Sequence, residues 1–326
     1  MADSTISQDI RVPSDSDYER RLMYVVYLLL VLSIVFSTYL HHFQPHVFRV
    51  PSNINIGSWQ HPSFEQTTIY DRMTEAERQR VLAEGIPQGE SLAAACFGDL
   101  LIILLSWILF RHARKHYGFW MASCFFIGSF VFTGLEESVW IVLGRFFGGS
   151  FSLSPGGVFW GTYWFTKGGM WFIETPMYAC LGWFLYAYSC VWVAGNVFKK
   201  MGPWARATVG GLLAMGVDLW ADPVNTSPEN MTWVWGKGDF FLFFGIPVYN
   251  FVGWFLVIFT FAVFWEKLPD LAKRWGTMRC TIYFVLICMV GGVVTAISIF
   301  TIWFIIAGNL LSLLGVNQVI HLPPGW

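Results

Sequence analysis

Long apolar runs are the feature that most constrains this chain. Several of them approach the roughly 20 apolar residues that a helix needs to cross the hydrocarbon core of a bilayer. The chain of 326 residues is 55% hydrophobic and only 13% charged, whereas a soluble domain carries about 25% charged residues. The sequence therefore predicts an all-α fold, a polytopic membrane helix bundle.

The apolar runs predict about seven transmembrane helices. They fall near 22–40, 92–110, 119–143, 174–194, 205–221, 245–265 and 280–305. Residues 1–21 then form an N-terminal tail, 22–305 the helix bundle and 306–326 a C-terminal tail. In the loop 41–91, Thr74 and Glu77 have capping-box spacing, which predicts a short surface helix. No internal repeat is evident in the sequence.

The distribution of basic residues predicts the orientation of the bundle. The tail 1–21 and the loops 111–118, 195–206 and 266–279 hold 13 of the 20 Lys and Arg residues. Because cytoplasmic loops are enriched in Lys and Arg, we expect the N-terminus in the cytoplasm and the C-terminus outside. The expected location is the inner (plasma) membrane of a bacterium or archaeon.

Acidic side chains gather at one predicted level, in the outer part of the membrane. Asp218 and Asp222 are four residues apart, so they share a helix face, and Glu137 and Glu174 fall at the same level. Intramembrane acids are rare and indicate function. Desolvation and mutual repulsion favour one aspartate remaining protonated near neutral pH, and a neutral carboxylic acid in an apolar cavity can protonate an alkene. The alternative is a structural role, in which Asp222 bonds a loop amide.

Aromatic side chains accompany these acids. Trp233 and Trp235 either line a pocket whose ring faces stabilise a cation, or belong to the aromatic belt at the membrane surface. The six cysteines lie in or beside apolar runs and are expected to act as small hydrophobic residues. We predict no catalytic metal, and the net charge of −1 gives no reason to expect a nucleic-acid partner.

Taken together, these stretches resemble a known family. The run DLWADPV (218–224), followed by WVW (233–235) and FFGIPVYNFVGW (243–254), is similar to the signature of the integral-membrane carotenoid hydratases. These are carotenoid biosynthesis proteins that act on the acyclic ends of carotenoids. Upstream, GLEESVW, GTYWFT and ETPMYACLGW resemble further elements of that family. The resemblance covers roughly residues 130–265.

The resemblance implies a lyase that adds water to a terminal alkene of an acyclic carotenoid by acid catalysis. Asp218 or Asp222 is then the proton donor, and the other acid or Glu137 orients water, with Glu174 as a further catalytic candidate. The substrate-binding candidates are Trp233, Trp235, Tyr163, Asn250 and Trp254. No dissociable cofactor is needed, and the partners are a carotenoid or other isoprenoid lipid and the membrane lipids.

Two other functions fit the same residues. A membrane terpene or lycopene-type cyclase uses the same protonation but traps the cation within the substrate. A non-catalytic pigment- or lipid-binding subunit of a membrane complex keeps the aromatic pocket and does not need the acids.

Overall fold

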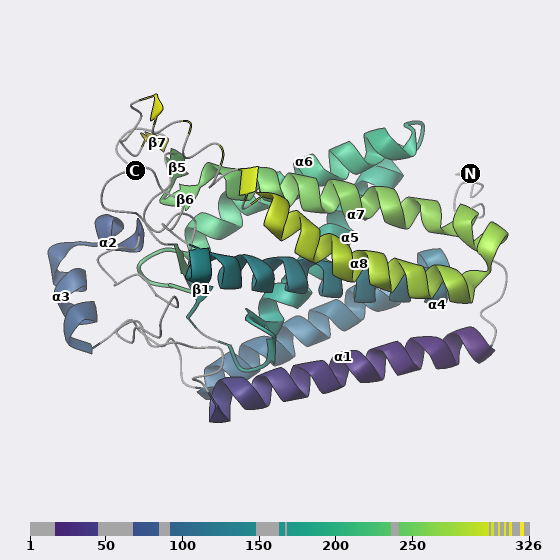
Figure 1. The fold of residues 1–326 in the computed structure, drawn as a ribbon, viewed down its shortest axis with the longest axis horizontal. Coiled ribbons are helices and arrows are strands. Elements are labelled where there is room, and N and C mark those ends of the chain that lie inside the picture. Colours follow the sequence, from purple (N-terminus) through teal and green to yellow (C-terminus); the bar gives the residue numbers. More distant parts are fainter. Residues whose placement is uncertain are drawn as a thin grey trace.

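The computed structural model shows an elongated bundle of helices with short strands at one end (Figure 1). It describes residues 17–44, 68–84, 92–147, 163–166, 168–235, 241–299 and 320–322, together with isolated positions between 301 and 314. The helices are α1 (Asp17–Phe43), α2 (Thr68–Arg72), α3 (Glu75–Glu84), α4 (Leu92–Phe147), α5 (Met177–Val197), α6 (Pro203–Asn225), α7 (Val248–Trp275) and α8 (Thr277–Ile299).

In the described part of the chain, short strands lie at one end of the bundle. They are β1 (Tyr163–Phe165), β2 (Trp171–Phe172), β3 (Thr175–Pro176), β4 (Trp233–Trp235), β5 (Phe241–Phe243), β6 (Ile246–Pro247) and β7 (Ile320–Leu322). β1 pairs with β4, β2 with β3, and β5 with both β6 and β7. The periodicity of the sequence predicts none of these strands, because two- and three-residue strands leave no measurable alternation of apolar and polar residues.

The predicted fold class, an all-α membrane helix bundle, is confirmed. Within the described residues, five helices are long and apolar enough to cross a membrane: α1, α4, α5, α7 and α8. Helix α6 packs against α5 and α7 as part of the same bundle. The number of seven spans and the orientation of the termini stay predictions.

Helix α4 contains a sharp reversal at Gly118. Its φ of 83° and ψ of 168° are not helical, and this backbone conformation is open almost only to glycine. The rings of Phe110 and Phe126, on opposite sides of Gly118, have centroids 5.9 Å apart, whereas a straight helix would separate these positions by about 24 Å. Helix α4 therefore consists of two arms that fold back on each other, and the arms correspond to the predicted spans 92–110 and 119–143.

Two predicted boundaries near the acids are wrong by a few residues. The span expected at 174–194 begins as α5 at Met177, because residues 171–176 form the β2–β3 hairpin. The span expected at 205–221 continues as α6 to Asn225. Pro223 lies inside this helix and lacks the N–H that would bond the carbonyl of residue 219, and the helix ends two residues later. Asp222 is thus a helical residue, one turn beyond Asp218.

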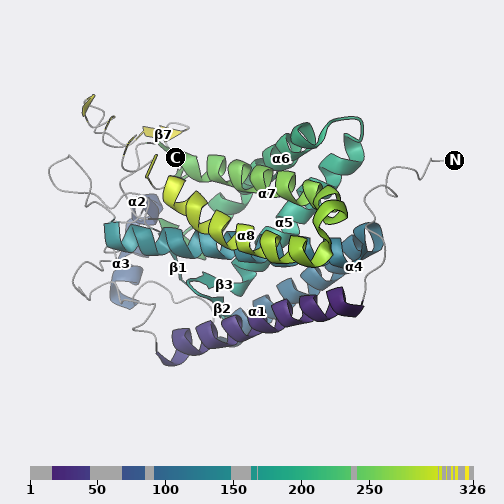
Figure 2. The ribbon, with the colours of Figure 1, turned by 45° about the vertical axis from the view of Figure 1, so that its right-hand side comes forward.

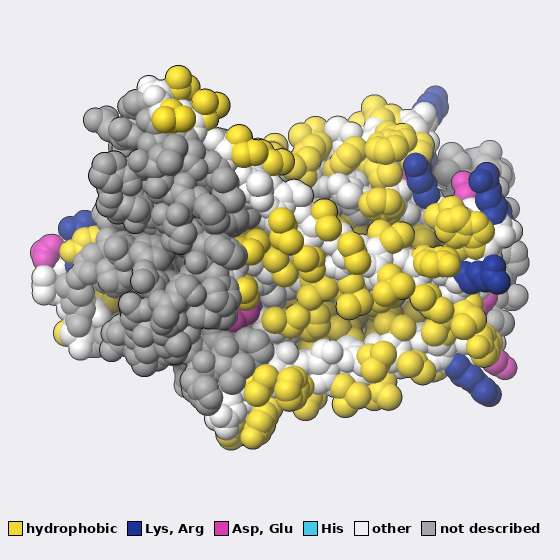
Figure 3. Space-filling model, viewed as in Figure 1, with side chains coloured by type: hydrophobic (Ala, Val, Ile, Leu, Met, Phe, Trp, Pro, Cys, Tyr) yellow, Lys and Arg dark blue, Asp and Glu magenta, His cyan; other side chains and the backbone are white. Residues whose placement is uncertain are grey.

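The surface separates apolar and charged side chains along the bundle. Figure 3 shows hydrophobic side chains over the middle of the molecule and Lys and Arg gathered at the end opposite the hairpins. Beneath this surface, aromatic rings fill the core; the ring of Phe125 meets those of Phe184, Phe261 and Trp265 at centroid distances of 5.0 to 6.1 Å. An apolar exterior around an aromatic core is the arrangement that a lipid environment favours.

In the loop after α1, the predicted capping box forms at the start of α3. Thr74 donates its backbone amide to Glu77 Oε2 at 2.7 Å, and the Glu77 amide donates to Thr74 Oγ1. The hydrogen bonds from Thr74 hold the pKa of the Glu77 carboxyl below its usual value.

The structure reveals an internal repeat that the sequence analysis misses. The segments FIETPMYACLGWF (172–184) and FFGIPVYNFVGWF (243–255) each form a tight hairpin followed by the first turns of a helix. Ile173 and Phe244 occupy the same place in the two hairpins and have nearly the same positive φ, 54° and 53°. The hairpin β2–β3 with α5 and the hairpin β5–β6 with α7 are therefore two copies of one unit.

Contacts between equivalent residues relate the two units by a local two-fold axis. Strands β1 and β4 pair antiparallel with Trp164 opposite Val234, and these strands occupy the same place ahead of the two hairpins. The rings of Trp183 and Trp254, at matching positions of the repeat, stack at a centroid distance of 3.7 Å. A two-fold axis brings equivalent elements together in this way.

The reversal at Gly118 generates a test of the fold. A Cβ at Gly118 would meet no atom within 4 Å, so Gly118→Ala adds only backbone strain, of about 1–3 kcal/mol. We expect a lower free energy of unfolding for this variant in detergent micelles. Gly195→Ala is the matched control, because Gly195 also has open space but is helical, and alanine favours a helix. Equal stabilities of the two variants would contradict the strained turn.

Candidate functional site

Two buried aspartates and one asparagine form the centre of the site. Asp218 and Asp222 lie one turn apart on α6, with exposed fractions of 0% and 3%. Asn250, in the first turn of α7, donates Nδ2–H to Asp218 Oδ2 at 2.9 Å and to Asp222 Oδ2 at 2.8 Å. The single amide group of Asn250 thus bridges the two carboxyl groups.

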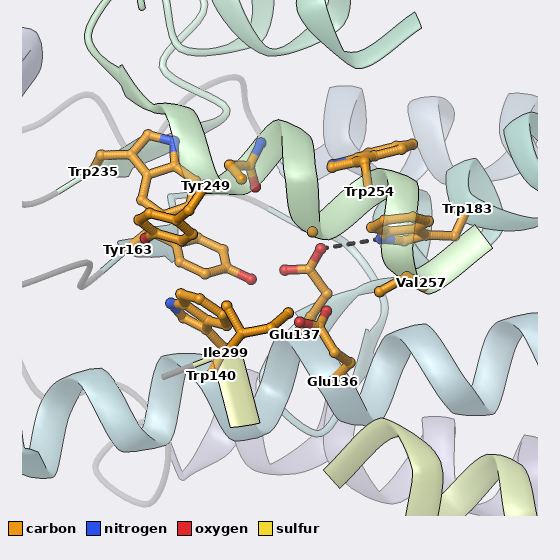
Figure 4. Close-up of a pocket in the computed structure, with 12 residues that line it drawn as sticks. Glu136, Glu137, Trp140, Tyr163, Trp183, Trp235, Tyr249, Trp254, Val257 and Ile299 are labelled. Carbon is orange, nitrogen blue, oxygen red and sulfur yellow. Dashed lines mark hydrogen bonds between the residues drawn. The ribbon is translucent and has the colours of Figure 1, made fainter. Parts of the chain in front are cut away.

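A third acid reaches the same region from α4. The indole Nε1–H of Trp183 donates to Glu137 Oε1 at 3.0 Å (Figure 4). Glu137 and Asp222 line the same cavity in the interior of the bundle. Glu136, the neighbour of Glu137, is also buried, with an exposed fraction of 7%. Acids from two helices thus converge in the interior, at the end of the bundle that carries the hairpins.

A cavity of about 190 Å³ lies beside these acids. Asp222 and Asn225 of α6, Tyr178, Gly182 and Tyr186 of α5, and Ile102 of the first arm of α4 form part of its wall. A second cavity of about 20 Å³ adjoins it and is lined by Glu136, Trp140, Tyr249, Gly253, Val257 and Ile299. Six residues line both cavities: Glu137, Tyr163, Trp183, Trp235, Asn250 and Trp254.

Aromatic faces enclose the space between the acids. The stacked pair of Trp183 and Trp254 forms one wall, and Tyr163 against Trp235, at a centroid distance of 4.5 Å, forms another. Aromatic rings that line a cavity can stabilise a cation over their faces by about 0.5–2 kcal/mol each. The site therefore combines a proton source with a lining suited to a short-lived positive charge.

Most residues singled out in the sequence lie in this site. Asp222, Glu137, Tyr163, Trp233, Trp235, Asn250 and Trp254 line one or both cavities. Asp218 lines neither cavity and joins the site through Asn250, which bonds both aspartates. Glu174 lies in the turn of the β2–β3 hairpin, outside both cavities, and its backbone amide donates to Ser138 Oγ at 3.2 Å.

The site residues predicted from the sequence do not include Trp183, Trp140 and Tyr249, which line the cavities. Trp183 was detectable, because it matches Trp254 in the repeat, in the shared pattern Gly-Trp-Phe. The stack of Trp140 on Tyr249, at 5.1 Å and 12°, joins α4 to α7 and has no local signature. Contacts of this kind depend on how distant helices pack.

Another intramembrane acid, Asp99, has a structural role. Its Oδ2 accepts the backbone amide of Met170 at 2.7 Å, in the loop before the β2–β3 hairpin. Helix α1 holds the same hairpin, because Thr38 and Ser37 accept the backbone amides of Trp171 and Ile173. These bonds fix the hairpin that precedes α5, the helix that carries Trp183 into the site.

Among the described residues, no group of three or more His, Cys, Asp or Glu side chains is arranged to hold a metal ion.

The comparison with protein families gives one match. The family model described as carotenoid biosynthesis protein matches residues 97–315, which include every residue that lines the two cavities. No curated protein and no solved structure matches the chain.

The bridging amide of Asn250 generates a test of the site. Asn250→Ala leaves two buried carboxyl groups without their shared donor, and we expect the free energy of unfolding to fall by about 1–3 kcal/mol. Unfolding in detergent micelles measures the effect. Asn196→Ala is the control, because the Asn196 amide bonds Trp192 at an exposed position. A double-mutant cycle with Asp222→Ala should show coupling between the two changes; strict additivity would contradict the bridge.

Proposed function

Because the chain belongs to the carotenoid biosynthesis protein family, we propose that it adds water to the terminal alkene of an acyclic carotenoid by acid catalysis. A role in carotenoid biosynthesis follows from the family, and the specific reaction is our inference. The observation that carries it is that Asp222, joined to Asp218 through the amide of Asn250, and Glu137 both line an aromatic-walled cavity inside a membrane bundle.

The size of the larger cavity suits one end of the substrate. Its volume of about 190 Å³ is somewhat more than the roughly 150 Å³ that accommodates a benzene molecule in an apolar protein cavity. It therefore holds one terminal isoprenoid unit and not a whole carotenoid. Ile102 lies on the rim, on an arm of α4 whose neighbours Leu101 and Leu104 are exposed, so the rest of the chain can extend past this arm into lipid.

Protonation is the first chemical step. The carboxyl proton of Asp222 goes to the less substituted carbon of the alkene, and the positive charge develops on the tertiary carbon. Asp222 lines the larger cavity, whereas Asp218 does not, so Asp222 is the donor. Asp218 and Asn250 act as positioning residues, which hold the donor carboxyl and stabilise its carboxylate after transfer.

Capture of the cation by water completes the reaction. The oxygen of water bonds to the tertiary carbon, and one of its protons goes to the carboxylate of Glu137. The net change is addition of one water molecule across the double bond. Return of the proton from Glu137 to Asp222, which both line the larger cavity, resets the site for another turnover.

The substitution Asp222→Asn tests the donor. It preserves the size of the side chain and removes the transferable proton, so we expect the hydrated product to fall at least about 100-fold. The measurement is the mass and absorbance of carotenoids extracted from a host that makes an acyclic carotenoid and expresses the variant. Asp270→Asn is the matched control, because Asp270 is an exposed residue near the other end of α7.

The same extracts separate the competing functions. A hydratase yields a product heavier than the substrate by one water molecule, whereas a cyclase yields an isomer of the same mass. A pigment-binding subunit yields neither product and retains bound pigment in the Asp222→Asn variant. Full hydration by that variant would refute the assignment of Asp222.

A further inference from the structure

The two cavities are equivalent halves of the internal repeat. Tyr249, Gly253 and Trp254 line the smaller cavity, and their repeat equivalents Tyr178, Gly182 and Trp183 line the larger one. In the paired strands, the two-fold axis passes between Trp164 and Val234, so Tyr163 of β1 corresponds to Trp233 of β4. Each cavity therefore lies between one hairpin–helix unit and the stacked pair of Trp183 and Trp254 on the local two-fold axis.

The two cavities differ in size because other elements enclose the smaller one. Side-chain size within the repeat does not account for the difference, because Asn250 lines both cavities and Tyr186 of the larger cavity is bulkier than its equivalent, Val257, of the smaller one. Trp140 stacks on Tyr249 at the wall of the smaller cavity, and Ile299 of α8 closes it. The result is a volume of about 20 Å³ on one side and about 190 Å³ on the other.

The smaller cavity has the dimensions and the polar lining of a single-water site. A cavity needs roughly 10–15 Å³ to hold one water, and that water needs two to four polar partners. Glu136, Glu137 and Asn250 line the cavity with polar atoms. Figure 4 shows the carboxyl groups of Glu136 and Glu137 and the hydroxyl of Tyr249 directed toward one space.

We propose that the smaller cavity, here called the water chamber, holds the water that adds to the cation formed in the larger cavity. This inference rests on the proposed hydration. Glu137 lines both cavities, so its carboxylate can hold the water in one and face the cation in the other. The water chamber decides the fate of the cation: with water present it becomes an alcohol, and without water it loses a proton and returns to an alkene.

The equivalent glycines supply a matched pair of variants. Among the described residues, a Cβ at Gly253 would contact only Ile299 Cδ1, at 3.8 Å, and a Cβ at Gly182 only Tyr186 Cε2, at 4.0 Å. Both Gly253→Ala and Gly182→Ala therefore fit without displacing neighbours. A methyl group is about the size of a water molecule, so it fills the water chamber but occupies a small part of the larger cavity.

The experiment separates protonation from hydration by using deuterium oxide. Each purified variant is placed in liposomes with an acyclic carotenoid, and mass spectrometry follows both the hydrated product and deuterium in the recovered alkene. For Gly253→Ala we expect hydration to fall at least about tenfold while deuterium still enters the alkene. For Gly182→Ala, which reduces room for the substrate, both signals should change together and their ratio should stay that of the unmodified protein.

A second change tests whether space is the cause. Ile299→Ala removes the side chain that a Cβ at Gly253 would contact, so the double variant Gly253→Ala/Ile299→Ala should regain hydration. If Gly253→Ala does not fold, as judged by thermal unfolding, Val257→Leu fills the same cavity with one added methylene group.

The outcomes distinguish the two proposals. An unmodified protein that neither hydrates the alkene nor exchanges deuterium refutes the proposed function itself. Unchanged hydration by folded Gly253→Ala, or loss of hydration and deuterium exchange in parallel, overturns the water chamber and leaves the proposed function standing.

Discussion

A carboxyl group buried in a membrane bundle must find its partners within the protein, and this constraint governs the end of the molecule that carries the hairpins. Lipid offers no hydrogen bonds, so an unsatisfied polar group there costs several kcal/mol. Asp218 and Asp222 each meet this requirement at one oxygen, Oδ2, through the shared Nδ2 group of Asn250. Glu137 meets it through the indole of Trp183. Polar contacts thereby join α4 to α5 and α6 to α7, and residues of both contacts line the cavities.

The internal repeat explains how such a site arises from one simple unit. A tight hairpin followed by a helix occurs twice, and each copy places a Gly-Trp pair beside the local two-fold axis (Figure 2 shows the bundle from a second direction). Two identical units would form two identical cavities. The surroundings of the two units differ, however: Trp140 stacks on Tyr249 and Ile299 of α8 lines the smaller cavity, which leaves one cavity of substrate size and one of water size. The chemistry that we propose needs this asymmetry, because alkene and water must approach the cation from different sides.

Much of the fold and part of the site could be predicted from the sequence. The lengths of the apolar runs predicted the bundle helices, and the spacing of Thr74 and Glu77 predicted α3, because both signals depend on neighbouring residues. The four-residue spacing of Asp218 and Asp222 placed both acids on one helix face for the same reason. The hairpins escaped prediction because they are too short for a periodic pattern. The repeat was not recognised in the sequence because its two copies share only a few residues, among them the proline, tyrosine and Gly-Trp-Phe positions.

The sequence by itself determined that this chain forms a membrane helix bundle and that two acids share one face of one helix, since hydropathy and helical spacing depend only on neighbouring residues. Only the tertiary structure decided that Asn250 binds both acids, that Glu137 reaches them from α4, and that Trp183 stacks on Trp254. These residues are separated by 28 or more positions along the chain. Their meeting depends on the reversal at Gly118 and on the packing of α4, α5, α6 and α7, which no local pattern specifies.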